Sequence, residues 1–238
     1  MKKGFSIKIS DKKTDIKSFV SGEYDDVYLQ TEHFDFLLEG VLLNKKKLLT
    51  EYALKDFETL IRELYTQKKQ GLIKEFEGEF RGFIWNKKEA KLYVFTNPTS
   101  TQRVFYSQFN NEIFIDTSLV RLNKTLLSSG IRTTPDLESI YQLLCFSNLP
   151  ERKTPIENIA KLLDGHYLEV DSSDLSYNEK EYFDISESPV FKGTKAAAVD
   201  QIHEIFAQSV IMEYQKDTEL GKNHLALLSG GLDSRVAM

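Results

Sequence analysis

The sequence contains little that would tie it to an oxidising compartment, a membrane or a nucleic acid. A single cysteine among 238 residues leaves no internal disulfide to form, which is typical of a reducing compartment. No apolar run approaches the ~20 residues of a membrane span, and the first residues turn polar at once, unlike a signal peptide. The net charge of -5 disfavours non-specific binding to nucleic acid or anionic lipid. These absences predict a cytoplasmic globular protein with no nucleic-acid or membrane partner.

Residues 33–120 are rich in short aromatic or β-branched segments between turn residues, which predict strands. The pair Asn110-Asn111 predicts a hairpin turn. Between the first two strands, apolar residues at helical spacing predict a helix that begins after Asp56. The predicted strands are 34–39, 79–85, 91–96, 103–107 and 112–116, and the helical face consists of Phe57, Leu60, Ile61, Leu64 and Tyr65.

The second half of the chain predicts two further helices. Residues 134–147 carry one apolar stripe, which places Cys145 in a core. A strand over 165–170 and a polar linker over 171–195 follow. The next helix turns its apolar side toward a core, and the chain then enters a buried strand over 225–228. The stripe is Leu137, Ile140, Tyr141, Leu144 and Cys145, and the apolar side of the later helix is Val199, Ile202, Ile205, Phe206 and Val210.

The segment Ser229-Gly-Gly-Leu-Asp-Ser234 follows that last strand. The glycines allow a tight turn, and Asp233 and Ser234 are suited to open a helix. Backbone N–H groups and the positive helix end would then meet at one point, which is an anion site of the kind that holds phosphate. Five fixed residues in this order are expected by chance roughly once in a million windows. The alternative is a plain strand–helix turn.

This loop resembles the PP-loop of the ATP pyrophosphatases, and most closely that of the asparagine synthetase family. The resemblance implies that the backbone from Ser229 to Ser234 holds the pyrophosphate part of ATP. It further implies that Leu228 lies against the nucleotide and that Asp233 helps to hold Mg²⁺. The nucleotide-binding set would be Leu228, Ser229, Gly230, Gly231, Leu232, Asp233 and Ser234.

Weaker resemblances to the same family precede the loop, where the family has a class II glutamine amidotransferase domain. Residues 38–44 resemble its Phe-Asn-Gly-Glu-Ile-Tyr-Asn turn, and 56–58 resemble its Asp-x-Glu. Residues 76–85 resemble its Leu-x-Gly-x-Phe-Ala-Phe-Ala strand. Residues 103–106 and 154–166 resemble its Pro-Leu-Tyr-Tyr and Leu-Pro-Pro-Gly-His regions. The implied fold is α+β: a four-layer αββα sandwich of the Ntn-hydrolase kind, followed by the start of an α/β PP-loop domain.

Several residues depart from the family pattern, and they indicate a vestigial glutamine pocket at Glu39, Gly40 and Asp56. The family's glutaminase uses a cysteine at position 2 as nucleophile, whereas this chain has Lys2. Glu39 replaces the asparagine of the oxyanion turn, and a carboxylate there would repel a developing oxyanion. Asp56 matches the residue that holds the amino group of glutamine, although we favour a helix N-cap. No catalytic residue is identified, and we expect no glutaminase activity.

We therefore expect a degenerate glutaminase-like domain over residues 1–190 and the first part of a synthetase domain over 191–238. The implied activity is that of an ATP- and Mg²⁺-dependent carbon–nitrogen ligase. Such a ligase adenylates a small-molecule carboxylate, aspartate by analogy, for attack by ammonia or an amine. Two alternatives stay open: a cyclising ligase of the β-lactam or lasso-peptide synthetase kind, and a non-catalytic binding or assembly fragment. The sequence also leaves a homodimer open.

Overall fold

The computed structural model describes residues 3–11 and 13–225 and divides the chain into two compact units, Met1–Asp184 and Ile185–Met238. Lys2, most of the predicted strand over 225–228 and the predicted nucleotide-binding residues 228–234 lie outside the described residues. We describe each unit by itself.

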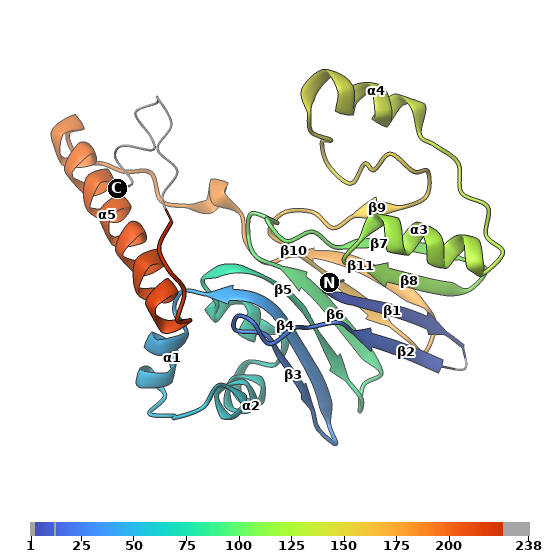
Figure 1. Ribbon diagram of the computed structural model, residues 1–238, viewed down its shortest axis with the longest axis horizontal. Coiled ribbons are helices and arrows are strands. Elements are labelled where there is room, and N and C mark those ends of the chain that lie inside the picture. Colours follow the sequence, from blue (N-terminus) through green and yellow to red (C-terminus); the bar gives the residue numbers. More distant parts are fainter. Residues whose placement is uncertain (1–2, 12, 226–238) are drawn as a thin grey trace. The chain divides into compact units, whose positions relative to one another are not determined.

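The first unit is built on two antiparallel sheets (Figure 1). The larger sheet has the strand order β11-β10-β6-β5-β4-β3, and the smaller has the order β2-β1-β8-β7-β9. The larger sheet consists of β3 (Val27–Gln30), β4 (Phe34–Leu42), β5 (Gly78–Asn86), β6 (Lys91–Thr96), β10 (His166–Asp171) and β11 (Ser176–Glu181). The smaller consists of β1 (Phe5–Ser10), β2 (Lys13–Ser18), β7 (Phe105–Phe109), β8 (Glu112–Asp116) and β9 (Ala160–Lys161).

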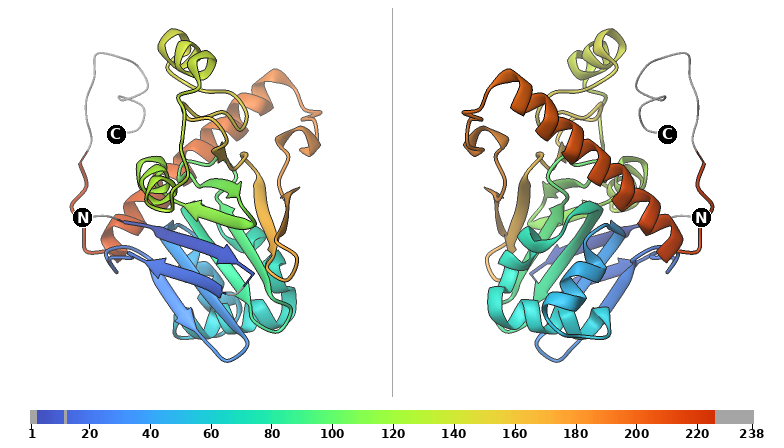
Figure 2. Two further views of the ribbon diagram at one scale, coloured as in Figure 1. Left: turned by 90° about the vertical axis from the view of Figure 1, so that its right-hand side faces the viewer. Right: turned by 90° about the vertical axis from the view of Figure 1, so that its left-hand side faces the viewer.

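Three apolar cores show that the first unit has four layers. One core lies between the two sheets and includes Phe5, Phe83 and Ile115. A second joins the outer face of the larger sheet to α1 (Lys45–Glu51), α2 (Phe57–Lys68) and the 3-10 helix η1 (Lys69–Glu75). The third packs α3 (Leu119–Ser128) on the smaller sheet. Figure 2 shows these helices on the outer sides of the sheets. The predicted αββα sandwich is therefore confirmed.

Strand β4 shows why its sequence is apolar almost throughout. Successive side chains of a strand point to opposite faces, and both faces of this sheet are covered. Phe36 and Leu38 accordingly pack toward the helices, whereas Leu37 enters the core between the sheets.

The hairpin between β7 and β8 turns at Asn110 and Asn111, as the sequence predicts. Both residues have positive φ, 49° and 58°. Two consecutive left-handed residues match the twist of a two-residue hairpin, and asparagine tolerates that conformation better than most residues. The predicted helix that begins after Asp56 is confirmed as α2, and its five apolar residues are all buried.

The prediction for residues 134–147 is right about the helix and wrong about its face. Helix α4 spans Leu137–Phe146, with Asp136 as its N-cap. Its buried residue is Ser139, whereas Tyr141 and Leu144 are 70% and 77% exposed, and Cys145 is exposed as well. The bridge between Pro135 and Ile156 ties the start of the helix to a loop rather than to a sheet. The apolar stripe therefore faces solvent.

A further expectation is corrected. The polar segment 171–195 is not linker throughout, because β11 pairs along its full length with β10. Strand β11 lies at the edge of its sheet with alternating exposed residues, which explains its polar sequence. Strands β1 and β2 were not predicted, although β1 buries Phe5, Ile7 and Ile9 in strict alternation.

The second unit contains the short 3-10 helix η2 (Ile185–Glu187) and the long helix α5 (Lys195–Glu219), capped by Thr194. The apolar side of α5 was expected to face a core, but Val199, Ile202 and Ile205 are 54% to 66% exposed. The described part of this unit holds no sheet on which that side could pack. None of the described helices is both long and apolar enough to cross a membrane.

Candidate functional site

A pocket of about 370 Å³ opens in the first unit beside the start of β1. Its walls come from the start of the chain, the loop between β2 and β3, the adjoining strands β4 and β5, and the loop before β7. The lining residues are Lys3, Tyr24, Asp26, Glu39, Gly40, Val41, Glu79, Arg81 and Gln102.

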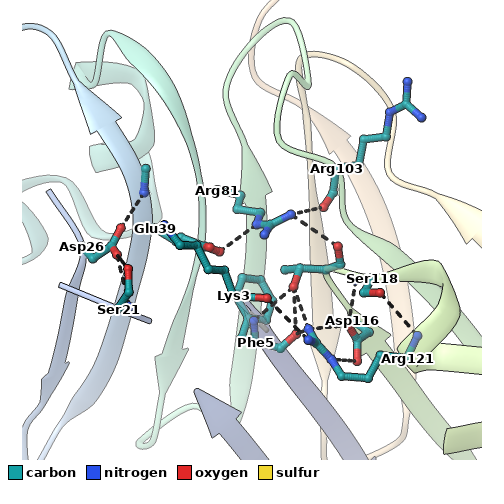
Figure 3. A network of polar contacts seen from close by, with 12 residues as sticks. Lys3, Phe5, Ser21, Asp26, Glu39, Arg81, Arg103, Asp116, Ser118 and Arg121 are labelled. Carbon is teal, nitrogen blue, oxygen red and sulfur yellow. Dashed lines mark hydrogen bonds and ion pairs between the residues drawn. The ribbon is translucent and has the colours of Figure 1, made fainter. Parts of the chain in front are cut away.

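Arg81 and Glu39 form a buried ion pair in this pocket (Figure 3). Arg81 Nε donates to Glu39 Oε2 at 2.9 Å, and the two residues are 9% and 6% exposed. They face each other because Glu39 and Arg81 are directly opposite in the register of β4 and β5. Arg81 Nη1 also donates to the carbonyls of Arg103 and Thr117, at 3.0 and 3.3 Å. The guanidinium therefore fills space beside β4 and is held there by three acceptors.

The side chain of Asp26 is hydrogen-bonded to the backbone of Gly40, the residue that follows Glu39. Its Oδ1 accepts a hydrogen bond from the N–H of Gly40 at 2.9 Å, and its Oδ2 accepts from the N–H and hydroxyl of Ser21. Asp25 adds a second tie, because its Oδ2 accepts from the N–H of Leu42 at 2.8 Å. The loop before β3 is thus fastened along β4, and the N–H of Gly40 already has a carboxylate acceptor.

Only glycine fits at position 40. Its φ is +131°, a value that residues with a side chain rarely adopt, and a Cβ there would lie 2.1 Å from the carbonyl oxygen of Glu79. The close approach of β4 and β5 at this point brings Glu39 and Arg81 together.

Lys3 reaches the pocket from the segment before β1. Its Nζ pairs with the carboxylate of Glu23 and lies 4.8 Å from the ring centre of Tyr24. The hydrogen bond to Glu23 raises the pKa of Lys3, so its amine stays protonated and is a poor nucleophile. The described residues that line the pocket include no serine, threonine or cysteine.

Arg121 fixes the segment that carries Lys3. It makes a bidentate pair with the fully buried Asp116, at 2.7 and 2.8 Å. Its other N–H groups donate to the carbonyls of Lys3 and Phe5, at 3.4 and 3.2 Å. The start of β1 is thereby held against α3 (Figure 3).

The structure brings two of the three predicted pocket residues together. Glu39 and Gly40 line the pocket, whereas Asp56 does not. Asp56 is the N-cap of α2, where Oδ1 accepts from the N–H of Thr59 at 2.8 Å and Oδ2 from its hydroxyl. These hydrogen bonds lower the pKa of Asp56. The N-cap interpretation of Asp56 is confirmed.

Two residues of the site were not singled out in the sequence. Arg81 had a visible signal, since it is a charged residue inside the apolar strand Phe80-Arg-Gly-Phe-Ile84. Asp26 had none, because it lies in a polar stretch that reads as an ordinary loop. Lys2, Leu228 and the loop from Ser229 to Ser234 lie outside the described residues, so their predicted roles stay predictions.

Comparison with known proteins places this chain in a family. The profile of the family described as "Glutamine amidotransferase domain" matches residues 31–183, which is more than half of the chain. This chain therefore belongs to the glutamine amidotransferase domain family.

Two curated relatives are asparagine synthetases. "Asparagine synthetase [glutamine-hydrolyzing] 1" of Bacillus subtilis (strain 168) is 24% identical over 180 residues, which are 75% of this chain and 27% of that protein. "Asparagine synthetase [glutamine-hydrolyzing] 2" of the same organism is 24% identical over 214 residues, 83% of this chain and 28% of that protein. The chain thus spans just over a quarter of the length of these relatives.

Among solved structures, glutamine phosphoribosylpyrophosphate amidotransferase from Bacillus subtilis, in complex with ADP and GMP, matches with a TM-score of 0.45 at 10% identity. The match covers 76% of this chain and 43% of that one. A structure described as the allosteric regulatory enzyme of purine biosynthesis matches with a TM-score of 0.47 at 8% identity, over the same shares of the two chains.

Proposed function

We propose that the first unit is a glutamine amidotransferase-type domain that does not hydrolyse glutamine. The observation that carries this proposal is the set of contacts at Glu39 and Gly40. The carboxylate of Glu39 is paired with the guanidinium of Arg81 in the wall of the pocket, and Asp26 already accepts a hydrogen bond from the N–H of Gly40.

Hydrolysis of an amide develops negative charge on the carbonyl oxygen, which needs free hydrogen-bond donors. By the sequence resemblance, Glu39 and Gly40 stand at the oxyanion turn. In this chain the carboxylate of Glu39 stands in place of one donor. The other donor, the N–H of Gly40, is already hydrogen-bonded to the carboxylate of Asp26. Both changes oppose the developing charge. Arg81, a cation that lines the pocket, is already paired with Glu39.

We further propose that the chain is part of an ATP-dependent ligase that forms an amide by adenylating a carboxylate. Its amine would be free ammonia or an amine substrate, because the proposed domain supplies none from glutamine. The support is the sequence Ser229-Gly-Gly-Leu-Asp-Ser234 and the similarity to two asparagine synthetases. ATP, Mg²⁺ held through Asp233, a cytoplasmic location, aspartate as acceptor and a homodimer belong to this proposal.

The first test is a glutaminase assay that follows release of glutamate from glutamine. We expect no release above the blank, and no effect of adding a carboxylate substrate and ATP. Release of glutamate would overturn the non-hydrolysing assignment. Binding of glutamine is measured separately by calorimetry, because a domain could bind glutamine without cleaving it.

The second test is ATP–pyrophosphate exchange by the intact protein with a panel of carboxylates, aspartate first. We expect exchange with one of them and its loss in Asp233→Ala, while Asp217→Ala keeps it. The control residue is an aspartate of α5 outside the predicted loop. Absence of exchange with every carboxylate would contradict the ligase assignment and leave the non-hydrolysing assignment standing.

A further inference from the structure

A second cleft, of about 250 Å³, lies in the first unit on the other side of Arg103. One wall comes from β7, β9 and the start of α3, and the other from the end of α4 and the loop that follows. Figure 1 shows α4 standing apart from both sheets. The lining residues are Arg103, Phe105, Leu119, Leu143, Ser147, Asn148, Leu149, Lys153, Thr154, Pro155 and Lys161.

Five of the residues that line the cleft are apolar, and they come from both walls. Phe105 and Leu119 come from the sheet side, and Leu143, Leu149 and Pro155 face them from the helix and loop. Leu149 is 9% exposed, so its wall is a packed surface. The cleft is smaller than the ~300–1,000 Å³ of pockets for drug-sized ligands, which restricts it to a small molecule.

The charge of the cleft is of one sign. Arg103, Lys153 and Lys161 line it and no carboxylate does, although the chain as a whole has a net charge of -5. Lys153 pairs with Glu138 at 2.8 Å. The side chains of Arg103 and Lys161 make no ion pair with any residue that the structure describes. Two cations are therefore left without a counter-charge beside an apolar wall.

Backbone contacts fix the positions of both residues in the chain. Lys161 lies opposite Phe105 in the register of β7 and β9. The carbonyl of Arg103 accepts from Arg81, and Figure 3 shows the side chain of Arg103 directed away from Arg81. The helix α3 begins at Leu119 in the same wall, so its positive end adds to the field of the cations.

We propose that this cleft binds a small amphipathic carboxylate. Its apolar or aromatic body lies against Phe105, Leu143 and Leu149, and its carboxylate lies beside Arg103 and Lys161. Concave apolar walls with few convergent charges are typical of small-molecule sites. A guanidinium next to low-dielectric walls binds a carboxylate more strongly than it does in open solvent. The inference is independent of the glutaminase and ligase proposals, because it uses none of the residues on which they depend.

The test uses the full chain and 3-phenylpropionate as probe, with binding followed by calorimetry and ligand-detected NMR. The charge-reversed counterpart is 3-phenylpropylammonium, and acetate supplies the carboxylate without the apolar body. We expect saturable 1:1 binding of 3-phenylpropionate, at least tenfold weaker binding of the ammonium compound, and no measurable binding of acetate.

Variants then locate the site. The double variant Arg103→Gln/Lys161→Gln removes both unpaired cations, and we expect it to weaken binding of 3-phenylpropionate at least tenfold. Lys55→Gln/Lys88→Gln removes the same charge from exposed positions outside the cleft and should change the affinity less than twofold. Leu143→Ser shortens the apolar wall at a half-exposed helix position and should also weaken binding.

Three results would overturn the proposal. They are absence of saturable binding of 3-phenylpropionate, equal binding of the anionic and cationic probes, and undiminished binding in Arg103→Gln/Lys161→Gln. Circular dichroism of each variant verifies that it is folded. If the double variant fails to fold, Arg103→Gln alone serves, because the side chain of Arg103 makes no hydrogen bond or ion pair with the residues that the structure describes.

Discussion

Arg81 and Glu39 lie opposite each other on β5 and β4 and form an ion pair 2.9 Å long in the wall of the pocket. A buried charge is stable only when it is paired and hydrogen-bonded. Arg81 alone would place a guanidinium among apolar strands, and Glu39 alone would place a carboxylate there. Each residue therefore supplies the counter-charge that the other needs when it is buried.

Removing one partner of this pair should destabilise the fold strongly. We expect Arg81→Met and Glu39→Leu each to lower the free energy of unfolding by about 3–5 kcal/mol, because each leaves a buried charge unpaired. The double variant should lose clearly less than the sum of the two single losses. Urea unfolding followed by circular dichroism measures all three.

The matched control is Lys180→Met in the pair between Lys180 and Glu169, which has a similar length of 2.8 Å. The side chain of Lys180 is 47% exposed, so its loss should cost less than about 1 kcal/mol. Strictly additive losses at Arg81 and Glu39 would show that the two charges do not depend on each other.

Gly40 should not tolerate a side chain. Gly40→Ala forces an L residue to φ +131° and places a Cβ 2.1 Å from the carbonyl of Glu79. The backbone strain alone costs about 1–3 kcal/mol, and the displaced strand adds to it. Gly130→Ala is the control, since its φ of +78° is also unfavourable but no atom lies within 4 Å. If both substitutions have the same effect on urea unfolding, the close approach of β4 and β5 is not required.

The N-cap Asp56 leads to a prediction of how the stability of the fold depends on pH. Its pKa is lowered in the folded protein by hydrogen bonds from Thr59, so the unfolded chain binds the proton more tightly. The stability that Asp56 contributes is thus present above its unfolded pKa and is lost as the pH falls through the folded pKa. The window lies below about pH 4, where an ordinary aspartate titrates.

Asp56→Asn separates the charge of this cap from its geometry. Asparagine also caps helices, so we expect little change in the free energy of unfolding at pH 7. Between pH 5 and pH 3 the variant should lose less stability than the original chain. Asp136→Asn, at the cap of α4, should behave in the same way, because the pKa of Asp136 is lowered by Ser139. Parallel pH curves for Asp56→Asn and the original chain would show that the carboxylate does not depend on Thr59.

A structural feature could be predicted from the sequence where it depends on residues that are close together in the chain. The turn at Asn110 and Asn111 and the cap at Asp56 are set by residues next to one another, and both were predictable. The layers followed from a resemblance of motifs rather than from periodicity. The pair of Glu39 and Arg81 depends on the register of β4 and β5, across 42 positions of sequence. No local pattern encodes that register.

Helix α4 is a case in which a local sequence pattern gave the wrong prediction. Its stripe of apolar residues has the spacing of a core helix, but spacing specifies which residues share a face and not what covers that face. The loop over 147–157 and the bridge between Pro135 and Ile156 turn Ser139 inward instead. Tyr141, Leu144 and Cys145 consequently face solvent.

The exposure of Cys145 leads to a prediction for its chemistry. Because it is the single cysteine of the chain, alkylation by iodoacetamide reports on this position alone. We expect the native protein to be alkylated at a rate within about tenfold of the urea-unfolded protein, since a thiol in solvent needs no opening of the fold. Intact-mass spectrometry over time gives both rates. A thiol buried in a core would react only through rare opening and would be slower by orders of magnitude. Such protection would indicate that Cys145 lies in a core, as the stripe predicts. Fast labelling, together with unchanged urea unfolding of Cys145→Ser, would show that this face of α4 contributes nothing to the stability of the first unit.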